Sequence, residues 1–269
     1  MDPTGRGPDR QAELTPQELP GEVAELVGEV SETRSPSRRR RVGEQIARIA
    51  GRSRRVAGRS GRAAGRGGRV GWHGLQSGGR WLTAEVLAMA PRLPVRDQQR
   101  LRGQFPGLGP EELADALIHG AARAAGVVGA ASGAAMVLPL PSAPAEIAVE
   151  TVALVGIEIK LVAELHEVYG MRAPGAPAER MMAYVAAWAH RRGVAIAPAG
   201  IVLVAGSPLR RRLQRRLLAR AGRSAVSLGP LLTGAVAGAA LNRLETRHLG
   251  ADVREDLRRR SPYATHWAG

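Results

Sequence analysis

Apolar residues recur every three or four positions along most of the chain after the first hundred residues, and the alternation typical of strands is almost absent. This period places them on one face of an α-helix. A first helix is predicted to begin at Pro110, because proline followed by two acidic residues suits a first helical turn. Further helices are predicted over 145–169, with Gly170 as C-cap, and over 178–191. The expected fold is all-α, an Ala/Gly-rich helical bundle with a disordered, Arg-rich N-terminal extension.

The helix over 145–169 is apolar around most of its circumference. Five of its charged residues share an arc of about 100°, namely Glu146, Glu150, Lys160, Glu164 and Glu167. A helix apolar over so wide an arc is typical of the centre of a bundle. Glu158 lies outside that arc, beside apolar residues. We therefore predict that Glu158 is a buried acid, and expect a structural ion pair with a base such as Arg123.

Three uncharged stretches of 17 to 22 residues follow one another along the chain, over 124–145, 193–209 and 224–242. They approach the length of a bilayer span, but their Ala, Gly and Pro content makes them weak transmembrane helices. Two of them carry glycines four residues apart, which predicts close helix packing. The predicted packing residues are Gly129, Gly133, Gly234 and Gly238. A glycine zipper inside a bilayer and a tight crossing within a helical bundle both explain this spacing.

Charge is distributed unevenly along the chain. The 269 residues carry a formal net charge of +15, from 38 Arg and one Lys against 24 acidic residues. Residues 1–32 hold eight acidic against two basic residues, whereas 33–80 hold fourteen Arg against one Glu. The first segment is rich in Pro, Gly and Glu, and we expect it to be disordered. Cysteine is absent, which excludes disulfides, thiolate nucleophiles and the common structural zinc sites.

Two Arg-rich segments predict contact with a membrane or another polyanion. In the first, seven arginines spaced three or four apart fall on one face of a helix: Arg48, Arg52, Arg55, Arg59, Arg62, Arg66 and Arg69. The second contains Arg210, Arg211, Arg212, Arg215 and Arg216. A basic amphipathic helix suits an anionic lipid surface. The Gly-Arg repeats also resemble nucleic-acid-binding tails, although no aromatic residue interleaves them, and a solvated flexible tail is the third explanation.

A family resemblance covers residues 108–260. It rests on 126–135, on the proline break at 139–144, on 146–170 and 178–184, and on the glycine-rich 229–242. These segments resemble the bacterial EcsC family. The resemblance implies an α-helical domain of poorly defined biochemistry, often linked to membranes or to transport and secretion, and it implies no catalytic residues.

The chain is thus divided into five predicted segments. These are a disordered acidic tail and linker (1–41), an Arg-striped arm (42–80), an amphipathic connecting helix and loop (81–107), an EcsC-like helical domain (108–260) and a tail (261–269).

No catalytic, metal or cofactor site is predicted. Lys160 does not follow a glycine-rich phosphate loop, and His166 begins a zinc-protease-like spacing that ends in Gly170 instead of histidine. The amide of Asn242 is expected to play a structural role at a helix end. We expect a non-enzymatic, cytoplasmic protein bound peripherally to the anionic inner face of the cell membrane. Nonspecific nucleic-acid binding through the Arg/Gly arm is the alternative, and an enzyme built around Glu158 is a third.

Overall fold

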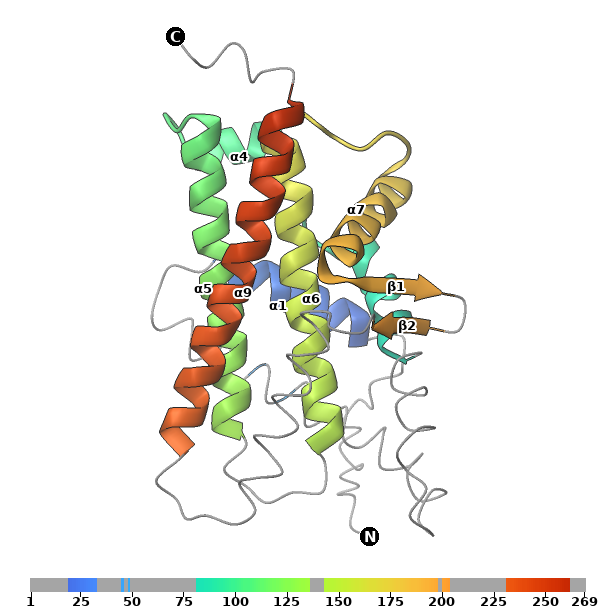
Figure 1. Ribbon diagram of the computed structural model, residues 1–269, viewed down its shortest axis with the longest axis vertical. Coiled ribbons are helices and arrows are strands. Elements are labelled where there is room, and N and C mark those ends of the chain that lie inside the picture. The colour runs from blue at the N-terminus through green and yellow to red at the C-terminus, as the bar shows by residue number, and fades with distance from the viewer. Residues whose placement is uncertain are drawn as a thin grey trace, which may run out of the picture.

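Three long helices lie side by side in the computed structural model (Figure 1). They are α5 (Pro110–Ala135), α6 (Ala143–Val168) and α9 (Leu231–Arg260). The structure describes residues 19–32, 45, 48, 81–135, 143–197, 200–203 and 231–261. Helices dominate these residues, so the predicted all-α class is confirmed.

Helix α6 is the centre of the bundle, as its apolar circumference predicts. Every residue from Val149 to Leu165 is buried, and the helix contacts α1, α4, α5, α7 and α9. Its end is also as predicted. Gly170 adopts φ of 65°, a left-handed conformation that suits glycine, and the N–H of Met171 donates to the His166 carbonyl at 2.9 Å.

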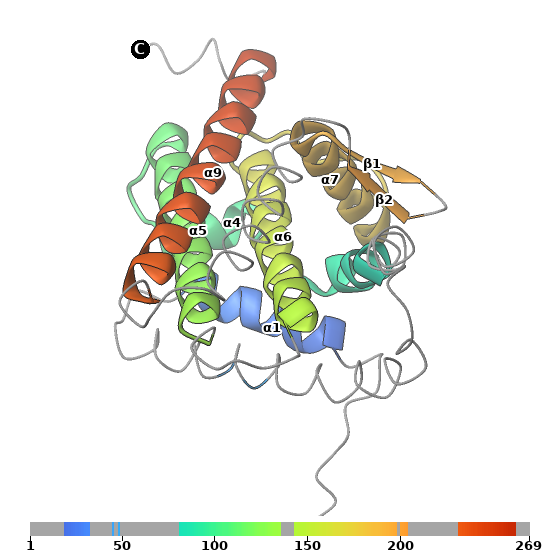
Figure 2. The same ribbon diagram turned by 60° about the horizontal axis from the view of Figure 1, so that its bottom comes forward.

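Helix α1 (Leu19–Glu32) crosses α5 and α6 (Figure 2). Its apolar positions, Val23, Leu26, Val27 and Val30, are all buried. The prediction of a disordered tail is therefore wrong for residues 19–32. The composition of the segment is polar on average, but its apolar residues recur at helical spacing and bury one face against the bundle. Residues 1–18 and 33–41 lie outside the described part.

The connecting segment forms part of the same core. It contains a helix over 81–89, the 3₁₀ helix η1 (Ala90–Arg92) and α4 (Gln98–Gln104). Met89 and Leu101 are fully buried. The Asp97 side chain caps α4 by accepting from the N–H of Arg100 at 2.8 Å. This segment therefore adds hydrophobic area to the bundle rather than only connecting two parts of the chain.

Helix α7 (Pro177–Arg192) packs beside α6 and leads into a short hairpin. Strands β1 (Val194–Ala197) and β2 (Gly200–Leu203) pair antiparallel, with Val194 opposite Leu203. The expected uncharged helical stretch over 193–209 is thus wrong at its start, because Val and Ile favour extended backbone and Gly193 ends α7 in a left-handed conformation. Among the described helices, none is long and apolar enough to cross a membrane.

Helices α5 and α9 pack closely against each other at Gly129. A Cβ atom placed on Gly129 would lie 2.4 Å from the Asn242 amide nitrogen and 3.1 Å from the Gly238 carbonyl oxygen. Glycine is therefore required there for the two backbones to approach. Gly129 and Gly238 face one another as packing residues. Gly133 and Gly234 belong to the same two helices, but their surroundings lie outside the described part of the structure.

Asn242 stabilises this crossing of α5 and α9. Its side chain is fully buried, and its amide donates to the carbonyl oxygen of Ala125 at 3.3 Å. The predicted structural role is confirmed, but the partner is a carbonyl inside α5 rather than a helix end.

At the far end of the bundle, the Tyr169 hydroxyl donates to Glu111 at 2.8 Å, and Ser261 donates to the Tyr169 carbonyl at 3.2 Å. These bonds join the start of α5 to the ends of α6 and α9.

Substitution of Gly129 by alanine is expected to destabilise the protein. The added methyl group would clash with Asn242 and the Gly238 backbone, so the free energy of unfolding should fall by about 1–3 kcal/mol. Urea denaturation measures this change. Gly103→Ala on α4 is the matched control, since a Cβ there meets no atom within 4 Å. This control should instead gain about 0.5–1 kcal/mol, and equal effects at the two positions would contradict the close crossing.

Candidate functional site

The Glu158 carboxylate lies at the junction of α6, α7 and α9. Its side chain is 2% exposed, and it forms an ion pair with Arg192 of α7. Arg192 Nε and Trp188 Nε1 donate to Glu158 Oε2 at 3.0 and 2.9 Å, while the Thr246 hydroxyl lies 3.4 Å from Oε1. The buried charge is thus matched by a cation and by several donors, which is the condition for keeping it inside a protein.

This geometry confirms that Glu158 is buried and corrects its partner. Arg123, the base suggested from sequence, is exposed on α5, whereas Arg192 is buried on α7. Burial by itself lowers the pKa of the Arg192 guanidinium, and the nearby Glu158 charge and hydrogen bonds more than offset this, so the pKa is raised. Because the carboxylate accepts hydrogen bonds from two other helices, it joins α6 to α7 and α9.

A second buried ion cluster joins α6 to the segment before α4. Glu164 accepts from Arg96 Nε at 2.8 Å and from Arg96 Nη2 at 2.6 Å, and it pairs with Lys160 one turn earlier. Lys160, the single lysine of the chain, also donates to the Pro94 carbonyl oxygen. Arg96 in turn donates to Gln104 at 2.6 Å. The cluster therefore fixes the 94–104 segment against α6.

A cavity of about 370 Å³ opens beside this cluster, between α5, α6 and the 96–105 segment. Its volume falls in the range of small-molecule sites, about 300–1,000 Å³. Its charged and polar lining residues are Ser31, Arg96, Gln104, Asp115, His119, Arg123, Lys160 and Glu164. Its remaining lining residues are Phe105, Ala116, Leu117, Gly120, Ala121, Ile157 and Leu161.

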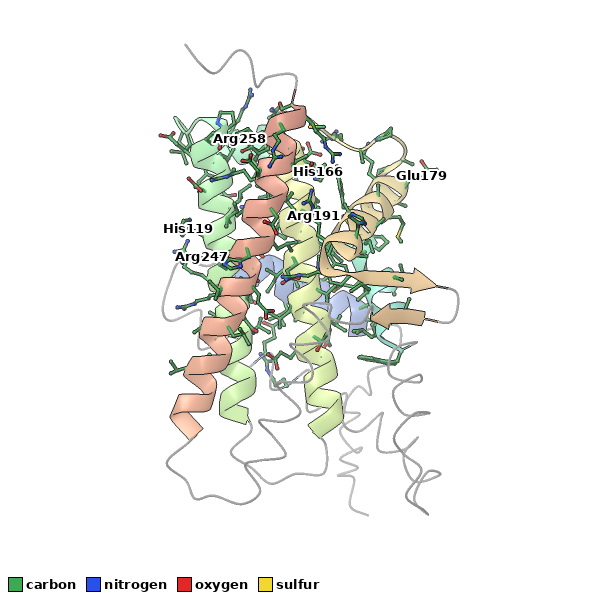
Figure 3. The ribbon with its side chains drawn as sticks, in the orientation of Figure 1. His119, His166, Glu179, Arg191, Arg247 and Arg258 are labelled. Atoms are coloured by element: carbon green, nitrogen blue, oxygen red, sulfur yellow. The ribbon has the colours of Figure 1, made fainter. Side chains whose placement is uncertain are left out.

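The outer side of α9 carries a second feature, which we name the α9 face: Val236, Ala240, Arg243, Leu244 and Arg247. All five side chains are exposed, Val236 at 67% and Leu244 at 51%. Arg243 crosses Gly126 of α5, and Gly250 contacts Ile118. This antiparallel register places Arg247 within about one turn of His119 along the helix pair, and Figure 3 labels both residues.

The two ends of α9 differ in charge pairing. Within the described residues, neither Arg243 nor Arg247 has a carboxylate partner within 4 Å. Near the C-terminal end the arginines are paired with acidic side chains: Arg254 pairs with Asp115, Arg258 and Arg259 with Glu255, and Arg260 and Arg191 with Asp256. The two α9 arginines without a described carboxylate partner therefore lie beside Leu244, on the stripe that also exposes Val236.

His166 of α6 lies against α7, where its ring centroid is 5.0 Å from that of Tyr184. Nδ1 is 2.7 Å from the Val162 carbonyl oxygen, which can only accept, so Nδ1 carries the proton. Burial lowers the pKa of His166, and the neighbouring positive charge of Arg191 lowers it further. His166 is therefore held as a neutral, packed side chain.

Most of the arginines predicted to contact a polyanion lie outside the described residues. The exception is Arg48, which is helical and exposed. The α9 face was missed by the sequence analysis, although its spacing of 4, 3, 1 and 3 residues is helical. The periodicity defines a stripe, but which stripe faces α5 and which faces outward depends on the crossing at Gly129. Within the described residues, no group of three or more histidine and acidic side chains is placed to hold a metal ion.

Neither protein-family models, nor curated proteins, nor solved structures match this chain. The resemblance to the EcsC family therefore stays a prediction.

Replacement of Glu158 by glutamine should destabilise the protein strongly, because it leaves the Arg192 guanidinium buried without its carboxylate. Breaking a buried pair in this way costs about 3–5 kcal/mol, which urea denaturation would detect. The double variant Glu158→Met with Arg192→Met is the control, and it should recover part of the loss because no unpaired charge is buried. A Glu158→Gln variant as stable as the parent would contradict the junction.

His166 should make stability depend on pH. Because its pKa is lowered in the folded protein, protons bind preferentially to the unfolded chain, so its contribution is complete above the ordinary value of about 6.5 and is lost as the pH falls below it. Thermal unfolding at about pH 7.5 and about pH 5.5 measures the effect. His166→Gln should show a smaller decrease in Tm on acidification, whereas His190→Gln, an exposed control, should match the parent.

Proposed function

We propose that this protein binds peripherally to anionic membrane surfaces through the α9 face. The observation that carries the proposal is the combination of exposed Val236 and Leu244 with two arginines that lack carboxylate partners among the described residues. The Arg-rich segments 48–69 and 210–216 would add to the same attraction. The EcsC resemblance of residues 108–260, a family often linked to membranes, supports the same class of partner.

Exposed aliphatic side chains on a folded helix favour an interface over water. Val236 and Leu244 lie two turns apart on one stripe, with Ala240 between them. Such a stripe can sit at the boundary between headgroups and acyl chains. Arginine suits this position, because its aliphatic stem lies along apolar surface while the guanidinium reaches the headgroups.

Charge provides the preference for anionic lipid. Each arginine near an anionic membrane surface contributes about 1 kcal/mol. Arg243 and Arg247 are available for this attraction, whereas Arg258, Arg259 and Arg260 already form ion pairs with acidic side chains. The part of α9 that binds the membrane is therefore the stretch from Val236 to Arg247. Nucleic acid would also attract the arginines, but a phosphate backbone offers nothing to the two aliphatic side chains.

Co-sedimentation with vesicles tests this proposal. The full-length protein should pellet with vesicles of phosphatidylcholine and phosphatidylglycerol, and much less with phosphatidylcholine alone. The double variant Arg243→Gln with Arg247→Gln should bind about 25-fold more weakly, since each arginine is worth about fivefold. Leu244→Glu should weaken binding similarly, because it places a like charge against the headgroups.

Two substitutions elsewhere serve as matched controls. Arg258→Gln removes an arginine of the paired end of α9, and Met182→Glu places an acid on an exposed apolar position of α7. Both should bind vesicles like the parent. Equal losses in controls and α9-face variants would show a nonspecific charge effect and overturn the proposal. Complete displacement by duplex DNA would overturn it in favour of the nucleic-acid alternative.

A further inference from the structure

The cavity beside the Lys160–Glu164–Arg96 cluster is lined by a position of α5 that lacks a side chain. Gly120 lines the cavity, and a Cβ built on it would meet no atom within 4 Å. The neighbouring α5 positions Ala116 and Ala121 are small as well. The space is thus an opening between packed elements that a larger residue at position 120 would fill.

The mouth of the cavity carries a guanidinium that no carboxylate neutralises among the described residues. Arg123 Nε donates to the His119 carbonyl oxygen at 3.3 Å, which orients the side chain and leaves the terminal nitrogens available. His119 Nδ1 lies 2.8 Å from the Asp115 carbonyl oxygen, so its proton is on Nδ1 and Nε2 is the second polar atom at the mouth. Asp115, the acidic residue of this region, already forms an ion pair with Arg254.

The inner end of the cavity carries charged side chains as well. Lys160 and Arg96 both line it, with Glu164 held between them. The described lining residues comprise three basic side chains against two acidic ones. This excess of basic side chains lies in surroundings of low dielectric constant, where charges interact more strongly than in water. An anion is the species that this lining favours.

Between these ends the wall is apolar. Leu117 of α5, Ile157 and Leu161 of α6, and Phe105 after α4 are among the residues that line the cavity. A ligand that fills it would bury hydrocarbon against these side chains. A bare inorganic anion would leave that surface without a partner.

We propose that the α5–α6 cavity binds a small amphiphilic anion, a carboxylate or a phosphate monoester with a short alkyl chain. Arg123 takes the anionic group at the mouth, and the alkyl chain lies against Leu117, Ile157 and Leu161. None of the residues that line the cavity belongs to the α9 face, so this proposal does not depend on the membrane proposal. The anion has two sources, a soluble metabolite or a lipid, and both present the same chemistry.

Thermal shift and isothermal titration with hexyl phosphate and hexanoate test the site on the full-length protein. Both ligands should raise Tm, whereas hexylammonium, with the same chain and opposite charge, should not. Inorganic phosphate should bind more weakly than hexyl phosphate because it gains nothing from the apolar wall. Equal effects of hexylammonium and hexanoate, or of inorganic and hexyl phosphate, would overturn the proposal.

Two variants locate the binding. Arg123→Gln should raise the Kd for hexyl phosphate about tenfold or more, as expected for loss of a charge-assisted hydrogen bond. Gly120→Leu should fill the cavity and abolish binding without loss of stability, because its side chain enters open space. Gly103→Leu, at another open helical glycine that does not line the cavity, is the matched control and should bind like the parent. Unchanged binding by Gly120→Leu would overturn the proposal.

Vesicle binding distinguishes the two sources and separates the two proposals. If Gly120→Leu loses hexyl phosphate but binds phosphatidylglycerol vesicles like the parent, the cavity ligand is a soluble anion. If it also loses vesicle binding, the ligand is the lipid itself. Leu244→Glu should do the opposite, with weaker vesicle binding and an unchanged Kd for hexyl phosphate, so failure at one site leaves the other testable.

Discussion

Buried charge on α6 is the constraint on which the rest of the structure depends. Glu158, Lys160 and Glu164 all lie inside the bundle, on a helix whose other faces are apolar. A buried charge without a partner is costly, so each must meet an opposite charge or a hydrogen-bonding group. Arg192 of α7 meets Glu158, and Arg96 meets Glu164. These two pairs decide which side of α6 receives α7 and which receives the 94–104 segment.

Once α6 is enclosed in this way, α5 and α9 are left to pack against each other along its remaining side. Gly129 allows the two backbones to approach closely, and the hydrogen bond from Asn242 to α5 stabilises the crossing. The crossing sets the rotation of α9, which turns Asn242 and Thr246 inward and Leu244 and Arg247 outward. The exposed face of α9 is therefore a consequence of the buried contacts, because a helix that buries one stripe of side chains leaves the opposite stripe exposed.

The same packing produces the two surfaces for which anion binding is proposed. The α9 face is exposed and partly aliphatic, which suits an extended lipid surface. The cavity at Gly120 is concave and lies next to a buried ion cluster, which suits one small molecule. Arg243 and Arg247 supply the charge on the α9 face, and Arg123 supplies it at the mouth of the cavity. Towards the C-terminal end of α9, Glu255 and Asp256 pair with the arginines instead.

The sequence by itself determined the helices α5, α6 and α7, the C-cap at Gly170, the central place of α6 and the burial of Glu158. These follow from periodicity and local backbone preferences, which act within a few residues. It did not reveal that residues 19–32 join the core, that Arg192 is the partner of Glu158, or that Val194–Leu203 pair as strands. It also did not show which stripe of α9 faces inward and which faces outward, or that Gly120 lines the α5–α6 cavity. Only the tertiary structure decided these points, because each depends on contacts between segments far apart in the chain.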